Sequence, residues 1–284
     1  MHDKPIGIFD SGIGGLTVLK EIRNILPRED IVYFGDTARV PYGTKSKETV
    51  IKFSLQDADF LSNFDVKMIV VACNTASSLS LDMLKRRYDI PLVGVIEPGA
   101  RKAASLTRKM KIGVIGTKAT VKSGIYEREV KKFNPAINVL STDCPLFVPL
   151  VEEGWLHGKI TEAIAKTYLA PVKKFGADVL VLGCTHYPLL KSVIQKALGR
   201  GVKLVDSAKE TAKEVKAIIE ENGMAKRSNE NPEYAFYVSD EPALFKKIGE
   251  KFLKRPIERI EKAEIELKEK YVHDRSISQF QRST

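Results

Sequence analysis

Short apolar runs alternate along this chain with longer segments in which apolar residues recur every three or four positions. The short runs, bounded by glycine or polar residues, are typical of buried parallel strands, and the longer segments are typical of amphipathic helices. This alternation predicts an α/β fold with mainly parallel sheets. The expected strands are residues 6–10, 31–35, 68–72 and 92–96, and the expected helices are 16–26, 46–63 and 74–88.

The same pattern starts again in the second part of the chain. Segment 111–117 repeats the apolar and glycine pattern of segment 5–11, and a periodic segment at 120–132 follows it. A second pair of matching segments, each containing a cysteine, has a similar offset of about 110 residues. Two similar offsets in the same strand-turn-helix context indicate an internal duplication.

The duplication predicts two pseudo-symmetric, doubly wound domains. The boundary is expected near residues 97–99, and the second unit is expected to end with a strand at 202–206. A helix at 208–221 and a strand at 234–238 are expected to return to the first unit. The predicted division is residues 1–97 with 208–254, residues 98–207, and a charged, helical C-terminal tail at 255–284.

Length and composition restrict the class of protein. The 284 residues, 43% of them apolar, are enough for two well-packed domains. The longest apolar runs have only the length of strands, so we expect no membrane span. Three cysteines do not form a disulfide framework and indicate a reducing cytoplasm. The net charge of +10 is spread over the expected helices, which favours solvated helix faces and attraction of a small dianion over a nucleic-acid partner.

Two of the cysteines occupy matching positions in the duplicated pattern. Cys73 and Cys184 each follow an apolar run and precede polar residues that can cap a helix. Open α/β sheets hold their active sites at such strand ends. A helix N-terminus can lower the pKa of each thiol from about 8.5 into the neutral range, where thiols transfer protons readily. The matched pair predicts two acid/base groups on opposite sides of one substrate, and therefore a racemase.

Other polar residues near these strand ends are candidates for the same site. Asp10 ends the first strand and is expected beside the first cysteine, with a helix cap as its alternative role. His186 lies two residues after the second cysteine, with a surface position as its alternative. The glycine-rich turn at 11–15 lacks the third glycine of a dinucleotide fingerprint, because Thr17 stands there, yet its amides can approach a carboxylate.

Three further segments have more than one interpretation. The pairs Asn74-Thr75 and Thr185-His186 either cap helices or hold a substrate carboxylate. The polar loop at 36–43 lies at a strand end, where binding residues concentrate. We interpret Cys144, which has no matched partner, as a core residue. No zinc site is expected, because the chain lacks Cys-x-x-Cys and His-x-x-x-His spacings.

Taken together, these residues make the chain resemble the glutamate racemase family, whose members are cofactor-independent enzymes that supply D-glutamate for peptidoglycan. The resemblance covers roughly residues 5–206, and the C-terminal tail lies outside it. The matching motifs are GIFDSGIGGL at 7–16, GDTARVPYG at 35–43, VACNTA at 71–76, CPLFVPLVEEG at 144–154 and LGCTHYP at 182–188.

The resemblance implies a pair of α/β domains with the substrate clamped between them. It implies that Cys73 handles the proton on the D face, with support from Asp10. It also implies that Cys184 handles the proton on the L face, with support from Glu152 and His186. Asp36 is implied to belong to the same acid/base network. The implied substrate contacts are Asp10, Ser11, Tyr42, Gly43, Asn74, Thr75, Thr117, Thr185 and His186.

The resemblance also sets the expected ligands and partners. Glutamate is the expected substrate, with no metal and no organic cofactor, and the expected assembly is a homodimer in the cytoplasm. Three alternatives stay open. The enzyme could act on aspartate or belong to a related isomerase with the same pair of cysteines. The chain could instead be a two-domain amino-acid binding protein with incidental thiols, or a redox switch that joins Cys73 to Cys184.

Overall fold

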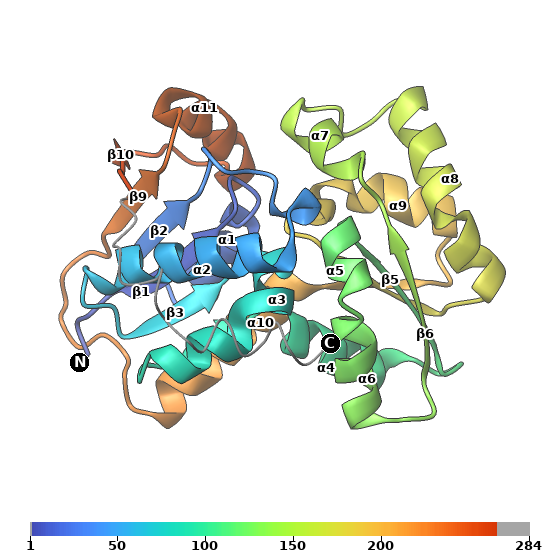
Figure 1. The fold of residues 1–284 in the computed structure, drawn as a ribbon, viewed down its shortest axis with the longest axis horizontal. Helices are drawn as coiled ribbons and strands as arrows, with labels where there is room; N and C mark the ends of the chain where they lie inside the picture. The colour runs from blue at the N-terminus through green and yellow to red at the C-terminus, as the bar shows by residue number, and fades with distance from the viewer. Residues whose placement is uncertain (1, 266–284) are drawn as a thin grey trace.

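The computed structural model describes residues 2–265 and folds them into two lobes, each built on its own parallel sheet (Figure 1). The sheet of the first lobe has the strand order β10-β9-β2-β1-β3-β4. The sheet of the second lobe has the order β6-β5-β7-β8. The first-sheet strands are β1 (Ile6–Asp10), β2 (Ile31–Gly35), β3 (Met68–Val71), β4 (Leu92–Gly94), β9 (Tyr234–Val238) and β10 (Ile260–Lys262). The second-sheet strands are β5 (Lys111–Gly116), β6 (Asn138–Asp143), β7 (Val179–Gly183) and β8 (Lys203–Asp206).

The order of strands confirms the internal duplication. The core of the first sheet, β2-β1-β3-β4, has the same connectivity as β6-β5-β7-β8, and every neighbouring pair of strands is parallel. β9 lies beside β2, so the chain returns to the first sheet after completing the second. Each unit is therefore a parallel sheet of the α/β type, as the alternating pattern predicts. The residue bounds of the two domains stay a prediction.

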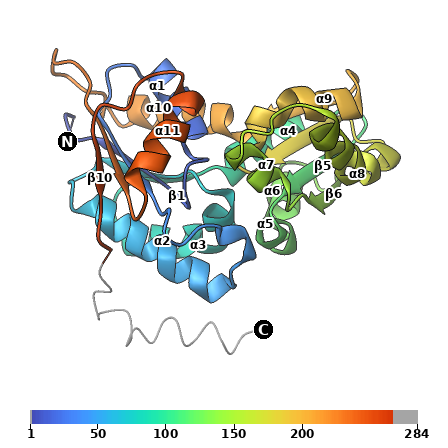
Figure 2. The same cartoon turned by 90° about the horizontal axis from the view of Figure 1, so that it is seen from above.

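Helices cover both faces of each sheet. In the first lobe, α1 (Leu16–Ile25), α10 (Ser207–Glu221) and α11 (Pro242–Leu253) pack on one face, while α2 (Lys47–Ser62) and α3 (Asn74–Arg87) pack on the other. Alternate residues of β1 pack against the two groups of helices: Ile8 faces the first group and Phe9 faces the second. Figure 2 shows the two lobes side by side when seen from above.

The second lobe has two pairs of packed helices on its sheet. The remaining helices of the described chain are α4 (Ile96–Leu106), α5 (Lys118–Lys122), α6 (Ile125–Phe133), α7 (Phe147–Glu152), α8 (Lys159–Phe175), α9 (Lys191–Leu198) and the 3₁₀ turns η1 (Tyr42–Thr44) and η2 (Tyr187–Leu190). α4 packs against α6, and α8 packs against α9. Gly113 approaches α8 on one face of the sheet, and Gly183 approaches Tyr126 of α6 on the other.

Two local differences from the predicted elements have clear causes. The helix expected at 120–132 is divided into α5 and α6, because Gly124 adopts a left-handed backbone with φ of 64°. The strand expected at 92–96 ends at Gly94, and α4 begins at Ile96. Pro98 is accommodated in the first turn of α4, where an amide proton would have no partner within the helix.

The prediction of a helical tail from residue 255 is wrong for the part that the structure describes. Residues 260–262 form strand β10, which pairs in parallel with β9 at the edge of the first sheet. The apolar side chains of Ile257 and Ala263 are buried there, and Lys254, with φ of 55°, ends α11. Pairing with an available sheet edge therefore overrides the local helix preference of a charged sequence. Residues 266–284 of the predicted tail lie outside the described residues.

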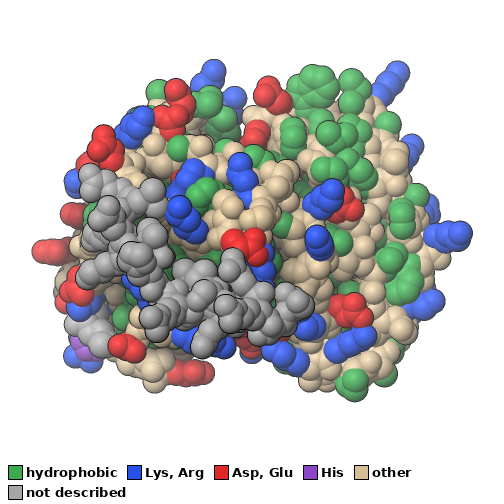
Figure 3. Space-filling view, in the orientation of Figure 1, with side chains coloured by type: hydrophobic (Ala, Val, Ile, Leu, Met, Phe, Trp, Pro, Cys, Tyr) green, Lys and Arg blue, Asp and Glu red, His purple; other side chains and the backbone are tan. Residues whose placement is uncertain are grey.

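Within residues 2–265, no helix has both the length and the apolar character needed to cross a membrane. Figure 3 shows lysine and arginine side chains interspersed with acidic ones over the face in view. This distribution agrees with the interpretation of the net positive charge as solvated helix faces.

Candidate active site

The two cysteines lie at equivalent ends of equivalent strands. Cys73 follows β3, is the N-cap of α3, and its sulfur accepts a hydrogen bond from the backbone N–H of Ala76 at 3.5 Å. Cys184 directly follows β7, but the backbone after it forms the 3₁₀ turn η2, with Pro188 near its start, before α9 begins. Only the first cysteine therefore caps an α-helix.

The two cysteines line one pocket between the lobes. The cavity has a volume of about 30 Å³, enough for a water molecule but not for an amino acid. The pocket must therefore widen for an amino acid to enter. Every substrate contact implied by the resemblance lines this cavity except Asp10, and the lining also includes Val40, Pro41 and Val148, which are not among the implied contacts. The lining residues are Ser11, Val40, Pro41, Tyr42, Gly43, Cys73, Asn74, Thr75, Thr117, Val148, Cys184, Thr185 and His186.

Cys73 is surrounded by groups that keep its thiol protonated. The side chain is only 5% exposed, and its thiol donates to Oγ of Ser11 at 3.6 Å. Burial, assisted by the negative field of Asp10, raises the pKa of Cys73 to about 12. The expectation that the helix N-terminus would lower this pKa is therefore wrong for Cys73 in this closed state, because desolvation outweighs the hydrogen bond from the helix.

Asp10 lies at the end of β1, next to β3, and is fully buried. One carboxyl oxygen, Oδ2, accepts a hydrogen bond from the backbone N–H of Gly12 at 3.1 Å. The other, Oδ1, has no hydrogen-bond partner among the described residues. Burial raises the pKa of Asp10, while His186 opposes this shift. The backbone N–H group of Gly15 also acts to lower the pKa of Asp10, and the carboxyl group does not line the cavity in this state.

Cys184 contacts a different set of side chains from those around Cys73. Its Sγ lies 3.8 Å from Nδ1 of His186, and Nε2 of the same imidazole lies 3.1 Å from Oε1 of Glu152, the last residue of α7. Burial acts to lower the pKa of His186, but the contacts with Cys184 and Glu152 outweigh it and raise the pKa to about 10. The imidazole is therefore protonated at neutral pH and lies between the sulfur of Cys184 and the carboxyl group of Glu152.

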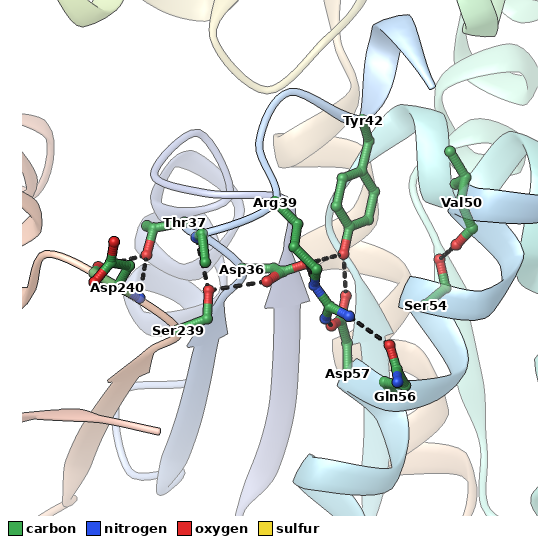
Figure 4. A network of polar contacts seen from close by, with 11 residues as sticks. Asp36, Thr37, Arg39, Tyr42, Val50, Ser54, Gln56, Asp57, Ser239 and Asp240 are labelled. Atoms are coloured by element: carbon green, nitrogen blue, oxygen red, sulfur yellow. Dashed lines mark hydrogen bonds and ion pairs between the residues drawn. The ribbon is translucent and has the colours of Figure 1, made fainter. Parts of the chain in front are cut away.

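The structure does not bring the Asp36 side chain to the cysteines. One carboxyl oxygen of Asp36 accepts from Nε of Arg39 and lies against the Tyr42 hydroxyl, and the other accepts from Oγ of Ser239 (Figure 4). Asp36 therefore belongs to a separate buried network. No group of His, Cys, Asp and Glu side chains within residues 2–265 converges as metal ligands would.

Several residues of the site carry no local signal in the sequence. The hydroxyl of Tyr126 in α6 donates to Oδ1 of Asn74 at 2.7 Å and lies 3.1 Å from Oγ of Ser207. Thr120 lies within 3.3 Å of the hydroxyl groups of both Thr75 and Thr117. Apart from the local Thr117–Thr120 contact, these contacts join residues that are far apart in the chain, and tertiary packing brings them together.

Replacing Tyr126 by Phe tests its role in orienting Asn74. Because the tyrosine hydroxyl occupies Oδ1, the amide group of Asn74 is left to donate to a ligand. Loss of this hydrogen bond, about 1 kcal/mol, is expected to raise KM about fivefold and leave kcat unchanged. Steady-state kinetics with Tyr88→Phe as the control, in which the lost hydroxyl bonds to Asp59 outside the pocket, checks this. Equal KM values for the two variants would contradict the role.

The duplicated fold and the paired cysteines at one pocket define the class of protein as the two-lobed α/β racemases. Residues 6–215 match the model of the Asp/Glu/Hydantoin racemase family. A glutamate racemase of Geobacter metallireducens is 54% identical over 250 residues, which cover 88% of this chain and 93% of that protein. A glutamate racemase of Neisseria meningitidis is 49% identical over 261 residues, covering 92% and 96% of the two chains.

The solved structures agree with this result. The crystal structure of glutamate racemase from Francisella tularensis in complex with D-glutamate has a TM-score of 0.89 and 43% sequence identity, and the match covers 94% of this chain and 99% of that one. The chain therefore belongs to the Asp/Glu/hydantoin racemase family, among its glutamate racemases.

Proposed function

We propose that this enzyme interconverts L-glutamate and D-glutamate by moving the α-proton between Cys73 and Cys184, without a cofactor. The single observation that supports this most directly is the position of both thiols on one pocket between duplicated strand ends. The choice of glutamate is supported by the names of the most similar relatives and by the D-glutamate in the Francisella tularensis structure. The alternative of an incidental pair of thiols leaves their equivalent placement unexplained.

The groups around the two cysteines support an assignment of the acid and the base in the conversion of L-glutamate. Cys73 holds its proton, since burial and Asp10 raise its pKa to about 12. Cys184 lies 3.8 Å from Nδ1 of His186, a group that can exchange a proton with its sulfur. We infer that Cys184 removes the α-proton of L-glutamate while Cys73 delivers its proton to the opposite face. The enzyme that releases D-glutamate then has the reverse protonation and is ready for the reverse reaction.

The α-proton of an amino acid is far less acidic than a thiol, so the transition state needs electrostatic help. The first turn of α3 offers the backbone N–H groups of Asn74 and Thr75, which have no partner within the helix. These groups can hold the α-carboxylate while negative charge develops on the α-carbon. The carboxyl group of Asp10 can accept from the α-ammonium group once the pocket widens. Closure of the lobes excludes water and strengthens each of these interactions.

Racemisation in deuterium oxide tests the two-base scheme. Because the proton that is delivered comes from the thiol opposite the base, and that thiol exchanges with solvent, D-glutamate formed from L-glutamate should carry deuterium at the α-carbon. Mass spectrometry or proton NMR of the product measures the label, and circular dichroism without added cofactor follows the conversion. Product that retains the original hydrogen would rule out the scheme.

A comparison of L-aspartate with L-glutamate under the same conditions tests the substrate assignment. The proposal predicts a higher kcat/KM for glutamate, and a preference for aspartate would overturn it.

We further propose that the enzyme supplies D-glutamate for peptidoglycan in the cytoplasm and acts as a homodimer. We also propose that residues 1–97 with 208–254 form one domain and residues 98–207 the other.

A further inference from the structure

A buried network of polar side chains (Figure 4) includes Tyr42, which lines the pocket together with Gly43. At its centre, the hydroxyl group of Tyr42 contacts Oδ2 of Asp36 and lies 2.8 Å from Oδ2 of Asp57, which projects from α2. Both carboxyl groups are fully buried, and Tyr42 is only 1% exposed. Two acidic side chains thus share one tyrosine hydroxyl in the interior.

Arg39 supplies the positive charge of this network. Its Nε donates to Oδ2 of Asp36 at 2.6 Å, and its Nη2 donates to Oδ1 of Asp57 at 2.9 Å. The guanidinium group also donates to Oε1 of Gln56 and lies over the ring of Phe53 at 4.2 Å. One arginine balances one carboxylate, so two ionised carboxylates would leave a buried negative charge without compensation.

Counting protons distinguishes the two carboxyl groups. The tyrosine hydroxyl has one proton and can donate it to only one of its two acidic neighbours. The other neighbour must then donate to the tyrosine oxygen and must itself carry a proton. Besides the tyrosine, Asp36 has two donors, Arg39 and Ser239 at 2.9 Å, whereas Asp57 has only Arg39, so the tyrosine proton is better placed on Asp36. Asp57 is therefore the group that donates.

We propose that Asp57 is protonated in the folded enzyme at neutral pH, and that its neutral carboxyl group is a positioning residue for the Tyr42–Gly43 wall of the pocket. Burial, with repulsion from Asp36, raises the pKa of Asp57 well above its ordinary value, although Arg39 and the Tyr42 hydroxyl act against the shift. The titratable and charged groups that face Asp57 are these three and, further away, Asp10.

The buried network connects directly to the pocket through Tyr42. Tyr42 and Gly43 both line the cavity, and a Cβ added to Gly43 would lie 2.6 Å from Cβ of Thr117. The segment held by the network is therefore a contact of the first lobe with the second. Fixing the Tyr42 hydroxyl fixes the backbone that meets Thr117 when the lobes are closed. The kinetic consequence rests on the proposed racemase function, whereas the protonation of Asp57 does not.

Two substitutions of Asp57 distinguish a neutral side chain that forms hydrogen bonds from one that is only buried. In Asp57→Asn, the amide oxygen can accept from Arg39 and the amide N–H can donate to Tyr42, which reproduces the protonated acid. Asp57→Ala removes both contacts. We expect KM for glutamate to be about tenfold higher in the alanine variant than in the asparagine variant, with the same kcat in both. Equal KM values would overturn the positioning role.

The proton itself can be measured without any assay of activity. The infrared difference spectrum of wild type minus Asp57→Asn at neutral pH should contain the C=O band of a protonated carboxylic acid. The matched control Asp59→Asn, on the same helix, should not remove that band. Absence of the band from the first difference spectrum would overturn the proposal, even if the enzyme proved inactive toward glutamate.

The free energies of unfolding of wild type and of Asp57→Asn should depend differently on pH. A group whose pKa is raised by folding contributes its stability fully below its unfolded pKa and loses it as the pH rises toward the folded pKa. The unfolding midpoint of wild type should therefore fall relative to Asp57→Asn as the pH rises above the ordinary pKa of an aspartic acid. Denaturant titrations measure this difference, and a difference that is constant with pH would contradict a protonated Asp57.

Discussion

Serine in place of either Cys73 or Cys184 is expected to reduce kcat for racemisation by about a thousandfold or more. A positioned acid or base contributes roughly 10²- to 10⁴-fold, and a serine hydroxyl is too weak an acid to replace a thiol in either role. Both cysteines line the same small cavity, so neither can substitute for the other on the opposite face of the substrate. Circular dichroism of the purified variants, starting from each enantiomer, measures the loss.

Cys144 provides the matched control for these substitutions. It is a fully buried thiol in the core and does not line the cavity. Cys144→Ala is expected to lower the unfolding midpoint while keeping kcat/KM within about twofold of wild type. If Cys73→Ser or Cys184→Ser retained more than about a tenth of the wild-type rate, thiol acid/base catalysis would be wrong.

Alanine at Gly14 is expected to reduce kcat/KM by about a hundredfold, which makes it the next largest effect. A Cβ at this position would lie 2.2 Å from Oγ1 of Thr185 and 2.6 Å from Nδ1 of His186. The first lobe would have to move away from the second, or the imidazole would have to leave Cys184. A displacement of about 1 Å in a catalytic constellation can cost about 10²-fold in rate.

Gly12→Ala in the same loop is the control for this prediction. Its added Cβ would meet Cγ2 of Val40 at 3.4 Å, which is ordinary contact. The unfolding midpoint of Gly14→Ala should stay near that of Gly12→Ala, since separation of the lobes relieves the clash without disturbing either core. Similar kcat/KM values for the two variants would show that close approach at Gly14 does not matter.

The glycine-rich turn shows how far sequence reasoning reaches. The pattern at 11–15 predicts a turn at a strand end with amides close to a ligand, and Ser11 of this turn does line the cavity. The sequence did not indicate that Gly14 must lack a side chain because His186 packs against it. That requirement comes from a residue more than half the chain away and exists only when the lobes meet.

The acidic residues show a second limit. The motif at 35–43 places Asp36 near the site, but its carboxyl group bonds to Arg39, Tyr42 and Ser239 rather than to the groups around the cysteines. Asp57 in the middle of α2 has no motif at all, although the structure buries it in the same network. A helical position predicts which face a side chain occupies, not the charge that it meets there.

The sequence by itself determined the strands other than β6 and β10, the duplication and the placement of the two cysteines at strand ends. These features follow from local periodicity and from glycine and polar residues at the ends of apolar runs, which act within a few residues. Only the tertiary structure decided that β10 pairs with β9 at the edge of the first sheet, and that the helix at 120–132 divides. It also decided the protonation of Cys73, since burial beside Asp10 outweighs the helix N-terminus. Desolvation and the partners of a charge depend on which distant segments cover it, and no local pattern carries that information.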